Sequence, residues 1–401
     1  MKKNNLKSKK KKNQKIKASG VLRHEKALSA KRLRKLVIAE LEELGLSFKN
    51  ESLQPSENTK EFTQQLHLPA REIVLASAGE WITYAWEKHK DFFAKGQDIN
   101  PKFVSPKLIE VVTKDQKELF RLARYTWSLP YTKGYGRRLQ YLLMDQSNDK
   151  LIGILGLQSP PLSFPGRDKL FSYPEGKKTE LLNQTMDIYT LGAIPPYSRL
   201  LGGKLLALAS ASNEVRLAYK RKYSGQITLM EERKLPARLV ALTTTSAYGR
   251  SSIYNRLRYN DTVKFQSLGY TEGYGAFHLE RLYPKFRVFL EAQEINTSGG
   301  FGKGPRIKWQ IMVRALERIG FDSSLLRHGV KREIFLIPLI RNLKSYMEGV
   351  QKRPDFIDAS FDELADFWRT RWLIPRSERV DGWCNWNPRK IEDLLFIKEE
   401  N

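Results

Sequence analysis

The segment 239–258, which reads LVALTTTSAYGRSSIYNRLR, limits the possible folds more than any other part of this sequence. A β-prone run ends in three threonines, the chain turns at Gly249, and a polar start for a helix over 251–259 follows. A strand, a glycine turn and a helix N-terminus gather donors around one point, where anions bind. The segment therefore predicts an α/β unit with a polar site at the end of the strand.

The remaining pattern of elements predicts three folded regions behind a basic tail. Helical spacing over 26–46 and 69–95, separated by a polar loop at 47–66, indicates a helical N-terminal region. The α/β core should contain a mixed sheet. Its expected strands are 139–144, 151–157, 187–191, 239–245 and 269–278, its helices are 108–124, 203–222 and 251–259, and 158–180 is a long loop.

A helix over 306–319 and a strand over 332–339 predict an α+β C-terminal region. We therefore expect four parts: a disordered basic tail at 1–20, a helical region at 21–105, an α/β core at 106–290 and the C-terminal region at 291–401. Nine lysines and no acid stand in the first 17 residues, so 17 of the 26 net positive charges belong to the rest of the chain. A body this basic favours nucleic acid as a partner.

The single cysteine, Cys384, excludes an intrachain disulfide and a zinc site built from cysteines. It fits a reducing compartment, and we expect a cytoplasmic protein. The lysine-rich start lacks the apolar stretch of a secretory signal, and no run of 18 apolar residues predicts a membrane span. No metal-ligand spacing is visible, so no metal and no cofactor are implied.

A second strand-to-helix turn lies at 189–204, which reads YTLGAIPPYSRLLGGK. Gly202 and Gly203 would let backbone N–H groups approach a ligand, and Arg199 and Lys204 would favour a phosphate. The alternative is a turn that uses its glycines for packing and binds nothing.

This turn resembles the pyrophosphate loop of the GCN5-related N-acetyltransferases, a strand followed by Arg/Gln-x-x-Gly-x-Gly/Ala and a helix. Arg199 and Gly202 match the pattern, and Lys204 stands where the family has a small residue. The resemblance extends to the later element order, with Asn255 on the helix before the final strands. It implies an acetyltransferase-like α/β core and an acyl-CoA-dependent transfer in which Tyr254 would be the general acid.

A resemblance that covers more of the chain, about residues 115–280, is to the DruA family of the Druantia anti-phage defence system. It rests on DIYTLGAIPPYSRLLGGKLLALAS, LVALTTTSAYGRSSIYNRLRY and LGYTEGYGAFHL. It implies a bacterial antiviral role beside other Druantia subunits, among them a large helicase-like protein. It implies no particular reaction and no catalytic residues.

The polar residues of 243–256 suit a phosphate, a sugar or a nucleotide edge. With the turn at 199–204 they form our candidate ligand site: Arg199, Gly202, Gly203, Lys204, Thr244, Thr245, Arg250, Ser251, Ser252, Tyr254, Asn255 and Arg256. The alternative is a capped helix whose serine and arginines serve structure alone. Nucleophilic catalysis would require Ser251 beside His278.

Two further motifs carry basic and aromatic residues. Trp368–Trp372 and Trp383–Trp386 could stack bases, although tryptophans at such spacing are more often core. The glycine loop at 296–304 lacks the Ser or Thr of a P-loop. We expect a protein that binds nucleic acid or a nucleotide-like ligand in a basic cleft, with an acyl transferase or a non-catalytic adaptor subunit as alternatives.

Overall fold

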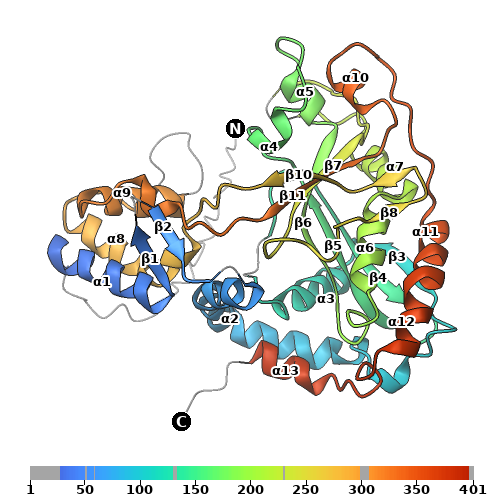
Figure 1. Ribbon diagram of the computed structural model, residues 1–401, viewed down its shortest axis with the longest axis horizontal. Helices are drawn as coiled ribbons and strands as arrows, with labels where there is room; N and C mark the ends of the chain where they lie inside the picture. The colour runs from blue at the N-terminus through green and yellow to red at the C-terminus, as the bar shows by residue number, and fades with distance from the viewer. Residues whose placement is uncertain are drawn as a thin grey trace, which may run out of the picture.

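The computed structural model describes residues 28–49, 52–57, 59–129, 133–228, 231–298 and 307–396. It contains a seven-stranded sheet flanked by helices, with a smaller lobe attached at one side (Figure 1). The tail expected at 1–20 lies outside the described residues, as do residues 299–304 of the glycine loop. Among the helices that the structure describes, none is long and apolar enough to span a bilayer.

The sheet has the strand order β10-β11-β7-β6-β5-β4-β3, and β6 runs parallel to β7 while the other neighbours are antiparallel. This is the mixed sheet that the sequence predicts. The parallel pairing joins only Thr185–Ile188 to Ala241–Thr244, so the second half of β6 parts from β7. The strands are β3 (Pro106–Glu110), β4 (Arg138–Asp145), β5 (Lys150–Gln158), β6 (Thr185–Ala193), β7 (Ala241–Thr245), β10 (Gln266–Tyr270) and β11 (Glu333–Pro338).

Helices bury both faces of the sheet, as a parallel pair at its centre requires. One face packs against α6 (Gly202–Ser210), α7 (Asn213–Tyr223) and α11 (Phe361–Trp368). The other packs against α2 (Lys60–His89), α3 (Lys114–Tyr125) and α13 (Arg389–Leu395). A third cluster joins β7 and β11 to α5 (Lys178–Leu182) and α10 (Leu343–Met347), near α4 (Pro165–Asp168).

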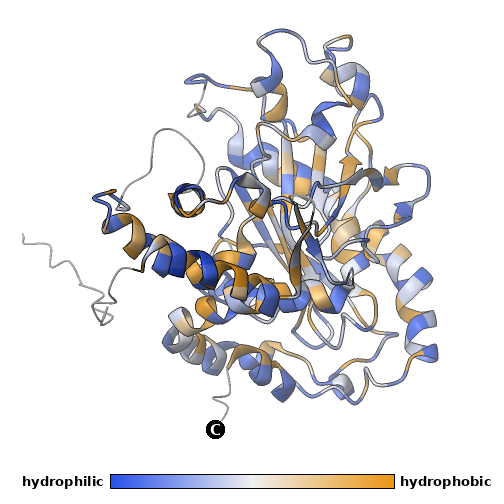
Figure 2. Cartoon of the chain, turned by 60° about the vertical axis from the view of Figure 1, so that its left-hand side comes forward, coloured by the Kyte–Doolittle hydropathy of each residue, from blue (hydrophilic) through white to orange (hydrophobic). Residues whose placement is uncertain are grey.

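The smaller lobe, which we define as the described residues of 28–66 and 276–330, has its own hydrophobic core. Leu33, Val37 and Leu41 lie on one side of α1 (Ala30–Glu43), as the 3.6-residue period predicts. They pack with α8 (Tyr283–Glu291) and α9 (Ile307–Arg318), whose sequence positions are far away. Figure 2 brings the lobe forward and shows bands of hydrophobic and hydrophilic residues along its helices.

The strands expected at 139–144, 151–157, 187–191, 239–245 and 332–339 are confirmed, and so is the helix expected at 306–319. The prediction of a helix at 251–259 is wrong. Ser251 caps a single turn, since its Oγ accepts hydrogen bonds from the N–H groups of Ile253 and Tyr254 at 3.2 and 3.1 Å. The chain leaves a helical path at Arg256, whose φ is 56°, and the Leu257 N–H bonds to the Tyr254 carbonyl rather than to that of Ile253.

Four other element predictions need correction because pairing partners distant in sequence decide the structure. The polar loop at 47–66 contains the hairpin of β1 (Leu46–Lys49) and β2 (Ser52–Pro55) and the start of α2. The helix at 108–124 begins only at α3, because β3 pairs with β4 first. The helix at 203–222 is divided into α6 and α7, and β10 ends at Tyr270 rather than continuing to 278.

Candidate functional site

The turn after β7, the most recognisable part of the sequence, closes around Glu333 at the start of β11. Ser246 donates its N–H to the Glu333 carbonyl at 2.8 Å, and the Glu333 N–H reaches the Ser246 hydroxyl and the Gly249 carbonyl. The Glu333 carboxylate accepts the Ser251 N–H at 3.3 Å and the Ser267 hydroxyl at 2.8 Å. These hydrogen bonds hold the turn against the sheet, so much of its polarity is used internally.

The threonines that precede the turn connect β7 to β6. Thr244 is buried and donates its hydroxyl to the Ile188 carbonyl at 3.2 Å, while Thr243 donates to the Asp187 carboxylate at 3.0 Å. Thr245 is half-buried at the end of β7. Thr244 therefore acts within the sheet, whereas Thr245 lies at its edge.

Tyr254 packs as a core aromatic residue. It is 6% exposed, stacks on Phe265 with ring centroids 5.8 Å apart and touches Phe335 at 5.3 Å. Burial raises the pKa of Tyr254 to about 12, so its hydroxyl stays protonated at neutral pH. Ser251 and His278 do not bond to each other in the structure, because the His278 ring bonds to the Leu325 carbonyl inside the lobe.

The start of α6 lies directly against this turn, so the two motifs from the sequence do come together. A Cβ on Gly203 would lie 3.1 Å from Ile253 Cδ1, and Gly202 packs equally closely on Ala193. Lys204 crosses between the motifs to the carbonyls of Ser252 and Ile253. Burial, reinforced by the charge of Arg371, lowers the pKa of Lys204.

The backbone N–H groups of the 199–204 turn are largely engaged. Those of residues 199, 200, 201, 202 and 204 donate to carbonyls of the same turn at 2.9–3.3 Å. Leu201, the N-cap of α6, has a φ of 60°, a conformation that costs a side chain of this size free energy. The Trp368 indole N–H donates to its carbonyl at 3.0 Å and stabilises the turn.

Exposed side chains of the candidate set point to solvent around this contact. Arg250, Ser252 and Arg256 are exposed, and Asn255 is half-buried with its N–H bonded to the Ser251 carbonyl. Arg256 has a φ of 56°, which turns the chain away from a helical path. The solvent-facing charge of the set therefore comes from Arg199, Arg250 and Arg256.

Two half-buried indoles, Trp372 on the core cluster beside α6 and Trp386 on the cluster beside α13, each lie close to two cations. Lys204 and Arg371 lie 5.4 and 5.6 Å from the ring centroid of Trp372. Arg199 and Lys390 lie 5.4 and 5.7 Å from that of Trp386. We call these residues the tryptophan–arginine patch: Arg199, Lys204, Arg371, Trp372, Trp386 and Lys390.

Local structure positions the patch. Residues Arg369–Leu373 form a π-helical turn between α11 and α12 (Ile374–Arg379), a distortion that is common at functional sites. Arg376 donates to the Arg199 carbonyl at 2.7 Å, and Arg199 donates to the Gly382 carbonyl at 3.2 Å. Trp368, by contrast, is fully buried. The two tryptophan motifs thus divide into core and surface residues.

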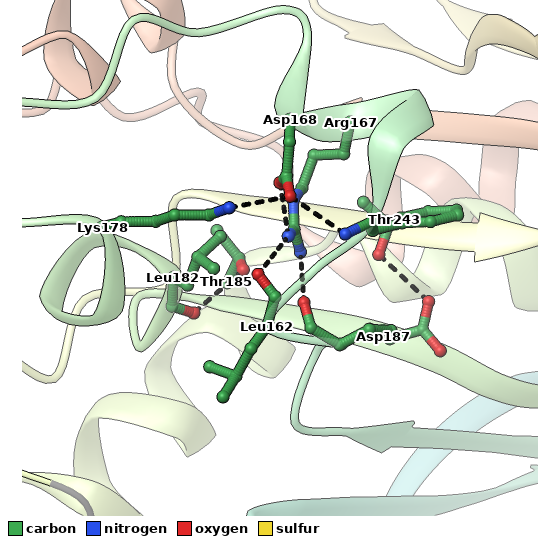
Figure 3. A network of polar contacts seen from close by, with 10 residues as sticks. Leu162, Arg167, Asp168, Lys178, Leu182, Thr185, Asp187 and Thr243 are labelled. Carbon is green, nitrogen blue, oxygen red and sulfur yellow. Dashed lines mark hydrogen bonds and ion pairs between the residues drawn. The ribbon is translucent and has the colours of Figure 1, made fainter. Parts of the chain in front are cut away.

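A polar network that the sequence analysis did not single out lies on the opposite face of the sheet (Figure 3). Asp187 accepts hydrogen bonds from Thr243 and from Gln158 at 3.2 Å. Burial raises the pKa of Asp187 to about 6. Nearby, burial opposes the ionisation of Asp168, but hydrogen bonds from the Phe164 N–H, Lys178 and Arg167 outweigh it and lower the pKa of Asp168. The sequence pattern places Asp187 in a strand and predicts no polar contact for it.

A cavity of about 580 Å³ opens where the lobe meets the sheet. Its walls include His67, Trp309, His328 and Arg332, and none of the twelve candidate residues is among its lining. No sequence pattern marks this cavity, because these residues are separated by up to 265 positions and come together only through α2, α9 and β11.

Comparison with known proteins shows to which family this chain is similar. The family model described as Druantia protein DruA matches residues 57–349. A Druantia protein DruA from Escherichia coli (strain UMEA 4076-1) is 36% identical over 370 residues, which is 91% of this chain and 92% of that relative. No solved structure matches the chain.

Proposed function

Because the chain belongs to the DruA family of the Druantia anti-phage defence system, we propose that it acts there by binding single-stranded nucleic acid on the tryptophan–arginine patch. The carrying observation is that Trp372 and Trp386 each lie within 5.7 Å of two cations, one of which comes from the turn at 199–204. Indoles stack on unpaired bases of any sequence, while neighbouring cations bind phosphates. The patch offers both contacts at a spacing fixed by folded structure.

The charge of the whole chain supports this proposal. The formal net charge is +26, and the exposed Arg250 and Arg256 extend the basic surface beyond Lys204. Like-charged side chains gathered on one surface attract a polyanion over a distance set by ionic strength. A large helicase-like Druantia subunit, acting in the same cytoplasm, is the partner that would present a separated strand.

The test is binding of the full chain to a fluorescent 20-nucleotide single strand, and to its duplex, over a salt series. We expect tighter binding of the single strand and a steep fall of affinity with salt. Arg371→Ala should reduce the salt slope by about one, while Trp372→Ala should weaken binding about tenfold or more with the slope unchanged.

The matched control is Arg353→Ala, which removes an exposed arginine after α10, outside the patch. The salt dependence of single-strand binding should fall less in Arg353→Ala than in Arg371→Ala. Strong binding that neither Arg371→Ala nor Trp372→Ala weakens would contradict the proposal and place the strand on another surface, with Arg250→Ala as the next variant. No binding at low salt would contradict it too, and would favour an adaptor role.

A second candidate function, acyl-CoA-dependent transfer, is favoured by one observation. Strand β6, the turn with Arg199 and Gly202, helix α6 and the parallel strand β7 follow in the order of the acetyltransferase-like core that the sequence resembles. Against it stand the internally bonded N–H groups of the turn and the long side chain of Lys204. Calorimetry with acetyl-CoA decides: without heat of binding, this candidate is eliminated.

A further inference from the structure

The cavity between the lobe and the sheet contains an arginine that forms no ion pair among the described residues. Arg332 lies just before β11, is mostly buried and lines the cavity. Among the described residues, no carboxylate lies within ion-pair distance of its guanidinium and no hydrogen bond of this group is found. The Asp187 carboxylate acts on Arg332 only from beyond ion-pair distance, so the guanidinium, partly removed from water at this cavity, is well placed to bind an anion.

The backbone around Arg332 is fixed. Its N–H donates to the Thr271 hydroxyl at 3.1 Å, and its carbonyl accepts the Thr271 N–H at 2.8 Å. The next residue, Glu333, is held by the turn after β7 through Ser246 and Gly249. The most recognisable motif of the chain therefore serves to hold the strand that carries Arg332.

Histidines form the adjacent wall. His67 is 8% exposed, its Nδ1 has no hydrogen-bond partner among the described residues, and its ring stacks on Phe277 at 4.2 Å. His328 accepts the Val330 N–H on Nδ1 at 3.2 Å and meets Phe277 from the side at 4.7 Å. An unpartnered imidazole nitrogen beside a free guanidinium is a site that lacks a polar ligand.

Two aromatic rings also line the cavity. Tyr274 is exposed and Trp309 half-buried, and their rings lie 5.2 Å apart in a tilted pair. The lining carboxylate of Glu280 is already neutralised by Lys308, and Glu272 is exposed. The cavity thus combines an anion-binding end with a surface on which a planar ring stacks.

We propose that this cavity binds a nucleoside monophosphate, with the phosphate on Arg332 and the base against Trp309 and Tyr274. The volume of about 580 Å³ lies within the range of small-molecule sites. A guanidinium matches two phosphate oxygens at once, and an indole accepts any base. The ligand is either a free nucleotide or the 5′-phosphorylated end of a strand, which share this chemistry. The site has no residue in common with the tryptophan–arginine patch.

The experiment is calorimetry of the full chain with AMP, GMP, CMP and UMP, with adenosine and inorganic phosphate as partial ligands. A six-nucleotide strand with a 5′-phosphate and one with a 5′-hydroxyl distinguish the two sources. We expect a mononucleotide, or the phosphorylated strand alone, to bind more tightly than either partial ligand. Arg332→Met should weaken this binding at least about tenfold, and Trp309→Ala should weaken nucleotide but not phosphate binding.

Lys331→Met is the matched control, because it removes the exposed charge next to Arg332 and should leave affinity unchanged. Retained binding in both Arg332→Met and Trp309→Ala would overturn the proposal, as would no binding by any mononucleotide or phosphorylated strand. Trp372→Ala, in the patch, should not affect mononucleotide affinity, so failure here is distinguishable from failure of the proposed function.

Discussion

Arg332 and Glu333 are neighbours in the chain, yet their side chains are in opposite situations. The carboxylate of Glu333 is 6% exposed and accepts hydrogen bonds from Ser251 and Ser267, while the guanidinium of Arg332 lies at a cavity without an acceptor among the described residues. The turn that looks like a binding site is internally satisfied. The cavity, which no sequence motif predicts, contains polar groups without hydrogen-bond partners among the described residues, such as His67 Nδ1.

This difference teaches that a high density of polar residues in a sequence does not measure how many of them are free to bind. Ser246, Ser251 and Thr244 bond to backbone or to Glu333, as polar groups near a core must. A ligand needs donors and acceptors that the fold leaves unpaired. Only the surroundings of each side chain, rather than its position in a motif, show which these are.

The largest expected effect is an acid sensitivity concentrated on the Arg332 side. Burial lowers the pKa of His67 and His278 to about 4 and that of His328 to about 3, with Arg332 adding to the shift of His67. Below pH 6.5 these histidines become protonated in the unfolded chain but stay neutral in the folded protein. The free energy of unfolding therefore falls as the pH falls. Each histidine should cost about 2 kcal/mol at pH 5.

Urea unfolding at pH 7.5 and pH 5.0 measures this loss. The variant His67→Phe retains a ring to stack on Phe277 and should lose about 2 kcal/mol less than the wild type between the two pH values. Equal losses in the two proteins would show that His67 is protonated in the folded state and that the contrast between the regions is smaller than we infer.

The next effect compares the neighbours directly. Glu333→Ala leaves the Ser251 N–H and the Ser267 hydroxyl without their acceptor and should destabilise the protein by about 3 kcal/mol. Arg332→Met removes a half-buried charge that has no ion pair among the described residues and only a longer-range interaction with Asp187, so stability should change by no more than about 1 kcal/mol. Denaturant unfolding measures both variants, with Lys331→Ala as the exposed control. A larger loss of unfolding free energy in Arg332→Met than in Glu333→Ala would contradict the contrast between the two residues.

The smallest effect concerns the contact between the two motifs. Lys204→Met removes the hydrogen bonds to the carbonyls of Ser252 and Ile253 and should cost about 1 kcal/mol. Lys220→Met, an exposed lysine on α7 with no such bond among the described residues, should stay within about 0.5 kcal/mol of the wild type. If the two variants melt alike, the turn does not depend on Lys204, and its polar groups are freer than we infer.

Sequence patterns predicted well those elements whose partners are adjacent along the chain. The strands β4 and β5, joined by a short turn, and the helix α9 with its regular apolar spacing were within reach of local periodicity. The helix expected at 251–259 is absent because the chain turns at Arg256, whose φ is 56°, and the Leu257 carbonyl then accepts the Phe265 N–H from the following strand segment. The four-part division of the chain remains a prediction, while the lobe core shows that segments from 28–66 and 276–330 pack together.

The candidate site was predicted in part. The sequence paired the turn at 199–204 with that at 243–256, and the structure brings them into contact through Gly203 and Lys204. It indicated tryptophans among arginines, but it could not tell the buried Trp368 from the half-buried Trp372. Asp187, His67 and Arg332 were missed, because nothing near each of them in the chain marks their surroundings.

By itself, the sequence determined the family, the basic character and the α/β class, because composition, motif strings and periodicity are properties of contiguous residues. The tertiary structure alone decided which polar groups are free. Whether a guanidinium has a counter-ion depends on three elements, α2, α9 and β11, that meet at one cavity from distant parts of the chain. Burial and partnership are properties of a packed volume, and no local pattern encodes them.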